Sequence, residues 1–253
     1  MRAITDPGRI DVLVLGGTTE GYDLAQALDD AGGVRVVTSL AGRTRQPRLP
    51  GGEVRIGGFG GAAALAAFLR ERKISAVVDA THPFAATMGW SAAEACREAG
   101  VSLLRLERPA WLPGPGDRWH EVAEWSEAVE LVAREARRVL LAIGRQELAP
   151  FAGIEPVWFL IRSVEAPDPM PPFRQAELLL ARGPFDLAGE RALLVDRRID
   201  TIVCKNSGGT ATDAKLAAAR EAGIRVVMQR RPRRPELPTV ASVAEALAWL
   251  AAL

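Results

Sequence analysis

Short apolar runs alternate with segments of helical period along most of the chain. The run at residues 10–15 ends in two glycines, and the following segment, 19–31, repeats apolar positions such as Ala25 and Leu28 at helical spacing. The same pattern predicts strands at 34–40, 53–56, 74–79 and 101–106 and helices at 62–72 and 84–99. Such alternation is typical of a parallel sheet with helices on both faces.

A stretch rich in proline and glycine at residues 109–116 interrupts this alternation. Proline lacks a backbone donor and has a fixed φ, so this stretch is a poor helix or strand interior and predicts a domain boundary. Beyond it we predict strands at 139–143, 157–161, 177–181, 201–204 and 224–229, helices at 126–138, 186–197 and 212–222, and a last helix containing Val243, Leu247 and Leu250.

The predicted fold is therefore α/β, with two Rossmann-like open parallel-sheet domains and a cleft between them. The predicted boundaries are 1–112 for an N-terminal dinucleotide-binding domain and 117–253 for a C-terminal Rossmann-like domain. The last helix is free to pack across the boundary. Ligands of such sheets bind outside the carboxyl ends of the strands.

The composition is that of a globular protein and argues against several classes. Hydrophobic residues make up 48% of the chain, and 32 basic against 31 acidic residues leave a net charge of +1, which does not favour nucleic-acid binding. No run approaches the roughly 18 apolar residues of a membrane helix. Two cysteines, Cys96 and Cys204, and two histidines without ligand spacing predict a cytoplasmic protein with no membrane partner and no bound metal.

The first glycine turn, G-G-T-T-E-G at residues 16–21, follows a predicted strand and opens a helix. Backbone N–H groups and the helix dipole at such a position favour a pyrophosphate. The dinucleotide fingerprint G-x-G-x-x-G fails at its middle glycine, where Thr18 stands. A glycine turn that binds no nucleotide is therefore an alternative interpretation at this point.

The end of the second predicted strand, V-V-T-S-L at 36–40, lacks the carboxylate that binds the ribose 2′-hydroxyl of NAD. Ser39 offers a hydroxyl, and Arg43, with Arg45 behind it, offers guanidinium groups that hold phosphate through paired hydrogen bonds. We therefore predict NADPH as the cofactor. The alternative for Arg43 is a solvated loop arginine.

The segment D-A-T-H-P-F at 79–84 places polar groups at a strand end, where a nicotinamide would lie. His82 is a candidate to protonate a substrate, and the alternative is a loop histidine that caps the next helix. The candidate cofactor-binding residues are Gly16, Gly17, Thr18, Thr19, Glu20, Ser39, Arg43, Thr81, His82 and Pro83.

In the second half, the sequence K-N-S-G-G-T-A-T-D-A-K at 205–215 follows a strand and predicts another anion-binding turn. With cations at other strand ends it suits an anionic substrate, and scattered surface charge is the alternative. The candidate substrate-binding residues are Arg145, Arg182, Lys205, Asn206, Ser207, Gly208, Gly209 and Lys215. The basic run R-R-P-R-R at 230–234 is interpreted as a solvated linker.

Two common enzyme classes are excluded by missing residues. The single tyrosine, Tyr22, is followed four residues later by Gln26, so the tyrosine–lysine pair of short-chain dehydrogenases is absent, as is the G-x-S-x-G elbow of serine hydrolases. What remains is a reaction in which a cofactor supplies hydride and the protein orients two partners.

Seven motifs occur in order along the chain: V-L-G-G-T-T-E-G, S-L-A-G-R, D-A-T-H-P-F-A, R-L-E-R-P-A-W, G-R-Q-E-L, R-G-P-F and C-K-N-S-G-G. Together they resemble the precorrin-6A reductase family of cobalamin biosynthesis over essentially the whole chain. The resemblance implies NADPH-dependent reduction of one carbon–carbon double bond of the precorrin-6A macrocycle to give precorrin-6B. It also implies that cofactor and tetrapyrrole lie between two domains. The alternatives are a cobalt-precorrin-6A reductase of the anaerobic route, a reductase of another polycarboxylate and a noncatalytic NADP-sensing protein.

The acetate and propionate groups of this tetrapyrrole substrate are carboxylates that the cationic side chains at 145, 182, 205 and 215 would bind. Its conjugated ring accepts hydride without a strong acid on the enzyme. A proton must still be supplied, and the catalytic candidates are Lys205, Asp213 and His82, with bound water as a further source.

Overall fold

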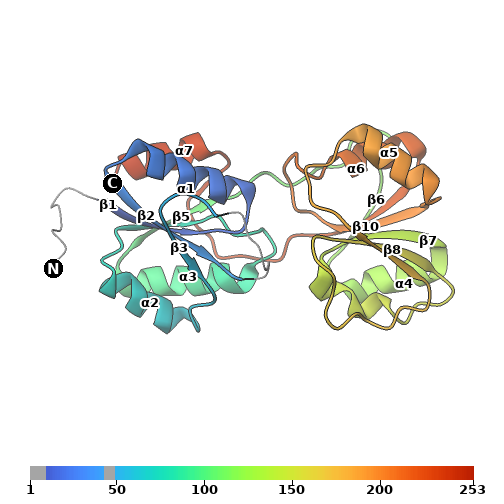
Figure 1. The fold of residues 1–253 in the computed structure, drawn as a ribbon, viewed down its shortest axis with the longest axis horizontal. Coiled ribbons are helices and arrows are strands. Elements are labelled where there is room, and N and C mark those ends of the chain that lie inside the picture. Colours follow the sequence, from blue (N-terminus) through green and yellow to red (C-terminus); the bar gives the residue numbers. More distant parts are fainter. Residues whose placement is uncertain (1–9, 43–48) are drawn as a thin grey trace. The chain divides into compact units, whose positions relative to one another are not determined.

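The computed structural model describes residues 10–42 and 49–253, which fold into two compact units. Unit 1 comprises Met1–Pro109 and Pro232–Leu253, and unit 2 is Ala110–Arg231 (Figure 1). The domain ranges predicted from the sequence are 1–112 and 117–253. They differ from these two units mainly in the last 22 residues of the chain, 232–253, which belong to unit 1. They do so because a short C-terminal strand and the last helix pack on the first sheet.

Unit 1 contains one six-stranded sheet in the order β12-β5-β4-β1-β2-β3, and all its pairs are parallel. Its strands are β1 (Ile10–Leu15), β2 (Val34–Leu40), β3 (Glu53–Ile56), β4 (Ala76–Asp79), β5 (Ser102–Leu106) and β12 (Thr239–Val240). Its helices are α1 (Thr19–Ala31), α2 (Ala62–Glu71), α3 (Ala86–Ala99) and α7 (Val243–Ala251).

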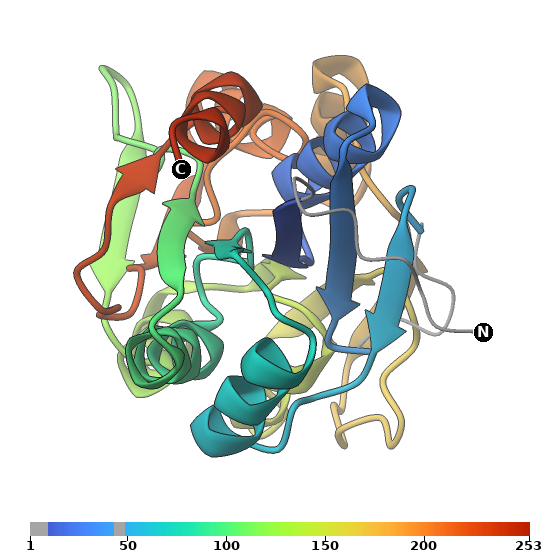
Figure 2. The same cartoon turned by 90° about the vertical axis from the view of Figure 1, so that its left-hand side faces the viewer.

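Alternating residues of the central strand β1 pack in two different hydrophobic clusters of unit 1. Val12 and Val14 pack in the cluster that holds α1 and α7, whereas Leu13 and Leu15 pack in the cluster that holds α2 and α3. Figure 2 shows these two helix layers on opposite faces of the sheet. A strand buried on both faces reads as a continuous apolar run, which is why this strand could be predicted from its residues alone.

Unit 2 repeats this layout with the sheet order β6-β11-β10-β7-β8-β9, again all parallel. Its strands are β6 (Arg118–Val122), β7 (Arg138–Ala142), β8 (Trp158–Ser163), β9 (Ala176–Leu180), β10 (Thr201–Lys205) and β11 (Arg225–Gln229). Its helices are α4 (Trp125–Glu135), α5 (Leu187–Asp196) and α6 (Ala214–Ala222), with two 3-10 turns, η1 (Arg145–Glu147) and η2 (Ala149–Phe151).

The prediction of an α/β protein with two Rossmann-like parallel sheets is confirmed, but two edge strands are additions to it. After β5 the chain enters unit 2 and forms β6 there, and only after β11 does it return to form β12 beside β5. The sixth strand of each sheet is thus supplied by the segment that follows the fifth strand of the other. In the described residues no helix is long and apolar enough to cross a membrane.

Candidate functional site

The strand ends of unit 1 bring the predicted cofactor residues to one edge. Leu15 at the end of β1 is paired with Ser39 on one side and Asp79 on the other, and Asp79 is paired with Arg105. Because these strands are parallel, the loops that follow them leave the sheet at the same carboxyl edge. The glycine turn and the segment 79–84 are therefore neighbours.

Thr18, at the position of the missing middle glycine, acts as the N-cap of α1. Its hydroxyl accepts a hydrogen bond from Gly21 N at 3.1 Å and donates to Ala80 O at 2.9 Å. A Cβ added to Gly21 would lie 3.0 Å from the Ala80 Cβ, so the third glycine of the fingerprint allows close packing of helix on strand. The threonine thus replaces a glycine without loss of the turn.

Gly17 leaves the turn open toward solvent. Its φ is +129°, a value that side-chain-bearing residues rarely adopt, and an added Cβ would meet nothing within 4 Å. The first N–H groups of a helix have no intrahelical acceptor, and at the start of α1 the Thr18 hydroxyl takes up that of Gly21, which leaves those of Thr19 and Glu20 for a ligand. The turn can therefore bind an anion through its backbone.

Glu20, in the first turn of α1, is paired with Arg108, which lies just beyond β5. The two side chains are 3.0 Å apart and are 24% and 16% exposed, respectively. A free carboxylate here would repel a pyrophosphate, and Arg108 offsets that charge. Arg108 belongs to the R-L-E-R-P-A-W motif, which supports the family resemblance but offers no local reason to place this residue at the turn.

The predicted 2′-phosphate site is described only in part. Ser39 is 7% exposed, and its carbonyl oxygen accepts a hydrogen bond from Gly16 N at 2.9 Å. This backbone contact ties the end of β2 to the glycine turn. Arg43 and Arg45 lie outside the described residues.

The segment 79–84 is held by hydrogen bonds within itself and from a distant arginine. Asp79 is fully buried, and its Oδ1 accepts from the Thr81 hydroxyl at 2.6 Å and from Thr81 N at 3.1 Å. His82 Nδ1 accepts a hydrogen bond from Phe84 N at 3.2 Å, so a neutral ring carries its proton on Nε2. Arg234 reaches Asp79 Oδ2 at 2.6 Å. No local pattern in the sequence points to this last contact.

In unit 2 three of the four predicted cations, Arg145, Arg182 and Lys205, lie at or just beyond strand ends, and two of these are paired with carboxylates. Lys205, at the end of β10, contacts Glu147 at 2.9 Å, and Arg145, beyond β7, contacts Glu165 at 3.0 Å. Arg182, two residues past β9, makes no hydrogen bond or ion pair with any residue that the structure describes. This edge offers positive groups to an anion, though at two positions the anion competes with a carboxylate.

The turn at residues 206–209 is built on glycines and fixed by Trp111. Gly208 and Gly209 have φ values of +68° and +75°. The side chain of Asn206 pairs with the Trp111 backbone, accepting from N at 2.8 Å and donating to O at 2.9 Å, and the indole N–H of Trp111 donates to Gly209 O at 2.9 Å. Arg231 donates to the carbonyl oxygens of Asn206 and Ser207. Asn206 therefore shapes the turn.

Lys215 lies beneath this turn rather than on its surface. It is 3% exposed, its ammonium donates to Thr212 O, and it lies 4.5 Å from the centre of the Trp111 ring. Burial lowers the pKa of Lys215 below its usual range. A direct contact with substrate would require this ammonium to leave both partners. Asp213, another catalytic candidate, stands at the N-cap of α6.

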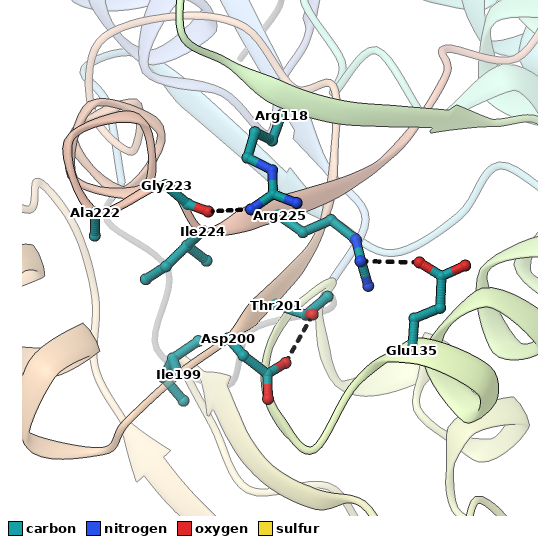
Figure 3. A pocket seen from close by; sticks show the side chains of 9 residues that line it. All are labelled: Arg118, Glu135, Ile199, Asp200, Thr201, Ala222, Gly223, Ile224 and Arg225. Atoms are coloured by element: carbon teal, nitrogen blue, oxygen red, sulfur yellow. Dashed lines mark hydrogen bonds and ion pairs between the residues drawn. The ribbon is translucent and has the colours of Figure 1, made fainter.

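A polar cavity of about 360 Å³ lies at the opposite end of the unit 2 sheet, where β6, β10 and β11 begin (Figure 3). Its two arginines have protein partners: Arg118 donates to Gly223 O at 2.9 Å, and Arg225 is 2.8 Å from Glu135. Because ligands of open parallel sheets bind at the carboxyl ends, this cavity is not the candidate site. The described residues contain no cluster of three or more potential ligands for a metal ion.

Comparisons with known proteins agree with the motifs. The family described as "Precorrin-6x reductase CbiJ/CobK" matches residues 11–251. A precorrin-6A reductase of Rhodococcus erythropolis is 52% identical over 96% of this chain and 98% of its own. A cobalt-precorrin-6A reductase of Salmonella typhimurium is 30% identical over 88% of each. The solved structure "CobK precorrin-6A reductase" has a TM-score of 0.90 at 42% identity, covering 96% of both chains.

Proposed function

We propose, from the premise that this chain belongs to the precorrin-6x reductase family, that it reduces one carbon–carbon double bond of precorrin-6A to give precorrin-6B in cobalamin biosynthesis. The chain is an oxidoreductase that acts on a tetrapyrrole ring and needs a reductant. We further propose that this reductant is NADPH, bound by unit 1, and that unit 2 binds the substrate.

The observation that supports a cofactor site in unit 1 is the open turn at Gly17 in front of α1. A dinucleotide pyrophosphate needs backbone N–H groups, room for close approach and a helix N-terminus, and all three are present there. Residues 16–20 would hold the pyrophosphate, Ser39 and Arg43 the 2′-phosphate, and Thr81, His82 and Pro83 the nicotinamide end. When bound, NADPH supplies the hydride.

The charge of the unit 2 strand ends supports substrate binding there. Precorrin-6A carries several carboxylates, and a guanidinium group can bind each through two parallel hydrogen bonds. Arg182 is directly available, while Arg145 and Lys205 can exchange their protein carboxylates for those of a substrate. Ser207, Gly208 and Gly209 would contribute backbone and hydroxyl groups, whereas Asn206 and Lys215 support the turn from within.

Two of the three candidate proton donors have local geometry that suits the role. Lys205 is 15% exposed and keeps its ammonium at a strand end, 2.9 Å from Glu147. His82 presents Nε2 once its Nδ1 has accepted the Phe84 N–H. Asp213 stands at the N-cap of α6, and its side chain makes no capping hydrogen bond there.

The cobalt-free substrate is preferred because identity to relatives named precorrin-6A reductase exceeds identity to those named cobalt-precorrin-6A reductase. The test is anaerobic incubation of the protein with NADPH and precorrin-6A, while NADPH absorbance and the product spectrum are followed together. We expect stoichiometric oxidation of NADPH with formation of precorrin-6B, and slower turnover with NADH or with the cobalt-containing ring. Binding of NADPH without oxidation in the presence of either tetrapyrrole would instead favour a sensing protein.

A further inference from the structure

The basic run at residues 230–234 is not a uniformly solvated linker. Arg233 is exposed, but the side chain of Arg234 is only 5% exposed. The backbone on both sides of Arg234 is anchored, because the Trp90 indole donates to Arg233 O at 3.4 Å and Arg105 donates to Pro235 O at 2.8 Å. The Arg234 guanidinium is therefore held at a fixed place inside unit 1.

That place is the buried end of β4. One amino group of Arg234 lies 2.6 Å from Asp79 Oδ2 and 3.1 Å from the Thr81 hydroxyl, and the other lies 2.8 Å from Glu107. The other oxygen of Asp79 accepts from the Thr81 backbone and hydroxyl. A single guanidinium thus fixes the carboxylate that in turn fixes residue 81.

The surroundings of Arg234 are shaped to admit this group and to balance its charge. A Cβ added to Gly89 of α3 would lie 2.7 Å from the Arg234 guanidinium, so a larger residue there would displace it. Asp79 and Glu107 are countered by Arg234 and by Arg105, which is paired in register with Asp79. Removal of one member would leave a buried charge without its counter-charge.

We propose that Arg234 is a positioning residue that holds residues 79–82 in the conformation that receives the nicotinamide end of the cofactor. This inference rests on the proposed function, because it assumes that Thr81 and His82 contact that cofactor. Arg234 itself need not touch the cofactor. It acts through Asp79, whose bonds to Thr81 set the direction in which the chain leaves β4.

The test compares Arg234→Lys with Arg233→Met in the full chain. Lysine keeps the charge but cannot bridge Asp79, Thr81 and Glu107 at once, whereas Arg233 is exposed in the same run and serves as the matched control. For each variant the Kd for NADPH is measured by fluorescence titration, the KM and kcat are measured at saturating tetrapyrrole, and the urea midpoint of the apoprotein is recorded.

We expect Arg234→Lys to raise the Kd and KM for NADPH roughly tenfold in protein that is fully folded, with Arg233→Met within about twofold of wild type. Asp79→Asn should raise the Kd by a similar factor, and the double variant should show little further loss, because both changes break the same connection. A purely structural arginine would lower the urea midpoint and leave the Kd and KM unchanged.

The outcomes separate the two proposals. If wild-type protein does not bind NADPH, the proposed function fails and the role of Arg234 fails with it. If wild type binds NADPH and Arg234→Lys binds it equally well, only the role of Arg234 is overturned. Independent, additive effects of Arg234→Lys and Asp79→Asn on the Kd would show that Arg234 does not act through Asp79, which also overturns the proposal.

Discussion

Unit 1 and unit 2 have the same strand order but differ in the segment that leaves the central strand. In unit 1, β1 leads through an open glycine turn into the 13-residue helix α1. In unit 2, the equivalent strand β7 leads through Gly144 into two 3-10 turns of three residues each. Only the first arrangement places the N-terminus of a long helix at the carboxyl edge of the sheet.

The difference indicates how one architecture can serve two ligands. At the position where unit 1 presents backbone N–H groups, unit 2 presents the side chain of Arg145, and Lys205 stands at the end of the neighbouring strand. Backbone groups at a helix N-terminus suit a pyrophosphate, whereas long cationic side chains adapt to carboxylates spread around a large ring. Substitutions made separately in each unit test the proposed division, in which unit 1 binds the cofactor and unit 2 binds the substrate.

The largest effect is expected from a matched pair of glycine substitutions. Gly17→Val should weaken NADPH binding by roughly 100-fold or more, because the side chain is strained at this φ and occupies the space through which the pyrophosphate approaches. Gly144→Val introduces the same substitution at φ +87°, with similarly open surroundings, after β7. Calorimetric titration should show unchanged NADPH binding by Gly144→Val. Normal binding by folded Gly17→Val would move the cofactor away from unit 1.

A smaller effect is expected at the adenosine end. Arg43→Ala should weaken NADPH binding by about 1.5 to 3 kcal/mol, the scale of a charge-assisted hydrogen bond to the 2′-phosphate. NADH lacks this phosphate and should bind nearly as it does to wild type. Paired titrations with the two nucleotides check the prediction, and equal losses for both would contradict the assignment of Arg43.

On the unit 2 side, Lys205→Met should lower turnover or macrocycle affinity by roughly tenfold, because the aliphatic stem stays while the charge is lost. The Kd for NADPH should change much less. Lys73→Met, which removes a lysine of unit 1 far from the strand ends of unit 2 in sequence, is the control and should leave both ligands unaffected. A larger loss of NADPH binding than of tetrapyrrole binding in Lys205→Met would reverse the proposed roles of the units.

The smallest effect concerns Lys215 and is one of stability. Burial lowers its pKa in the folded state, so between that lowered pKa and the unfolded value near 10.4 the unfolded chain binds more protons. Wild-type stability therefore rises with pH through this window, and Lys215→Met lacks that rise. At pH 7 the variant should be as stable as wild type or more stable by about 1 kcal/mol, and it should lose this advantage toward pH 10.

Urea unfolding of wild type and Lys215→Met at several pH values measures the difference between their free energies of unfolding. The titration of groups that both proteins share cancels in this difference. A difference in unfolding free energy that stays constant with pH would mean that Lys215 is solvated. Lys215→Met should also reduce turnover less than Lys205→Met, because its ammonium faces Trp111 and Thr212.

The central strands and the helices could be predicted well from the sequence because their apolar residues are buried on fixed periods. The same patterns did not predict β6, an edge strand with a largely polar sequence, or β12, which has only two residues. Nor could local patterns reveal that these strands are exchanged between the sheets, because pairing partners are set by tertiary packing. The helix predicted at 84–99 begins two residues later in the structure, at Ala86, because His82 and Phe84 form a turn before α3.

The sequence predicted the parts of the candidate site that depend on the local shape of the backbone. It did not predict contacts between side chains that are far apart in the sequence. The glycines at 16, 17 and 21 indicate the turn from the sequence alone, and Gly16 and Gly21 stand at the first and third glycine positions of the nucleotide fingerprint. The burial of Lys215 and the reach of Arg234 depend on residues more than 100 positions away along the chain. A basic run looks the same in sequence whether its arginines face water or a buried carboxylate.

The exchanged sixth strands also set the order in which the protein can be completed during synthesis. Arg105 of β5 pairs with residue 239 of β12, so the first sheet keeps an open edge while all of unit 2 is made. At about 5 to 20 residues per second, the ribosome needs on the order of ten seconds to reach the missing strand. The unit 1 sheet, most of which is synthesised first, is therefore the last to be completed. A message truncated near its end would leave this sheet without its edge strand β12.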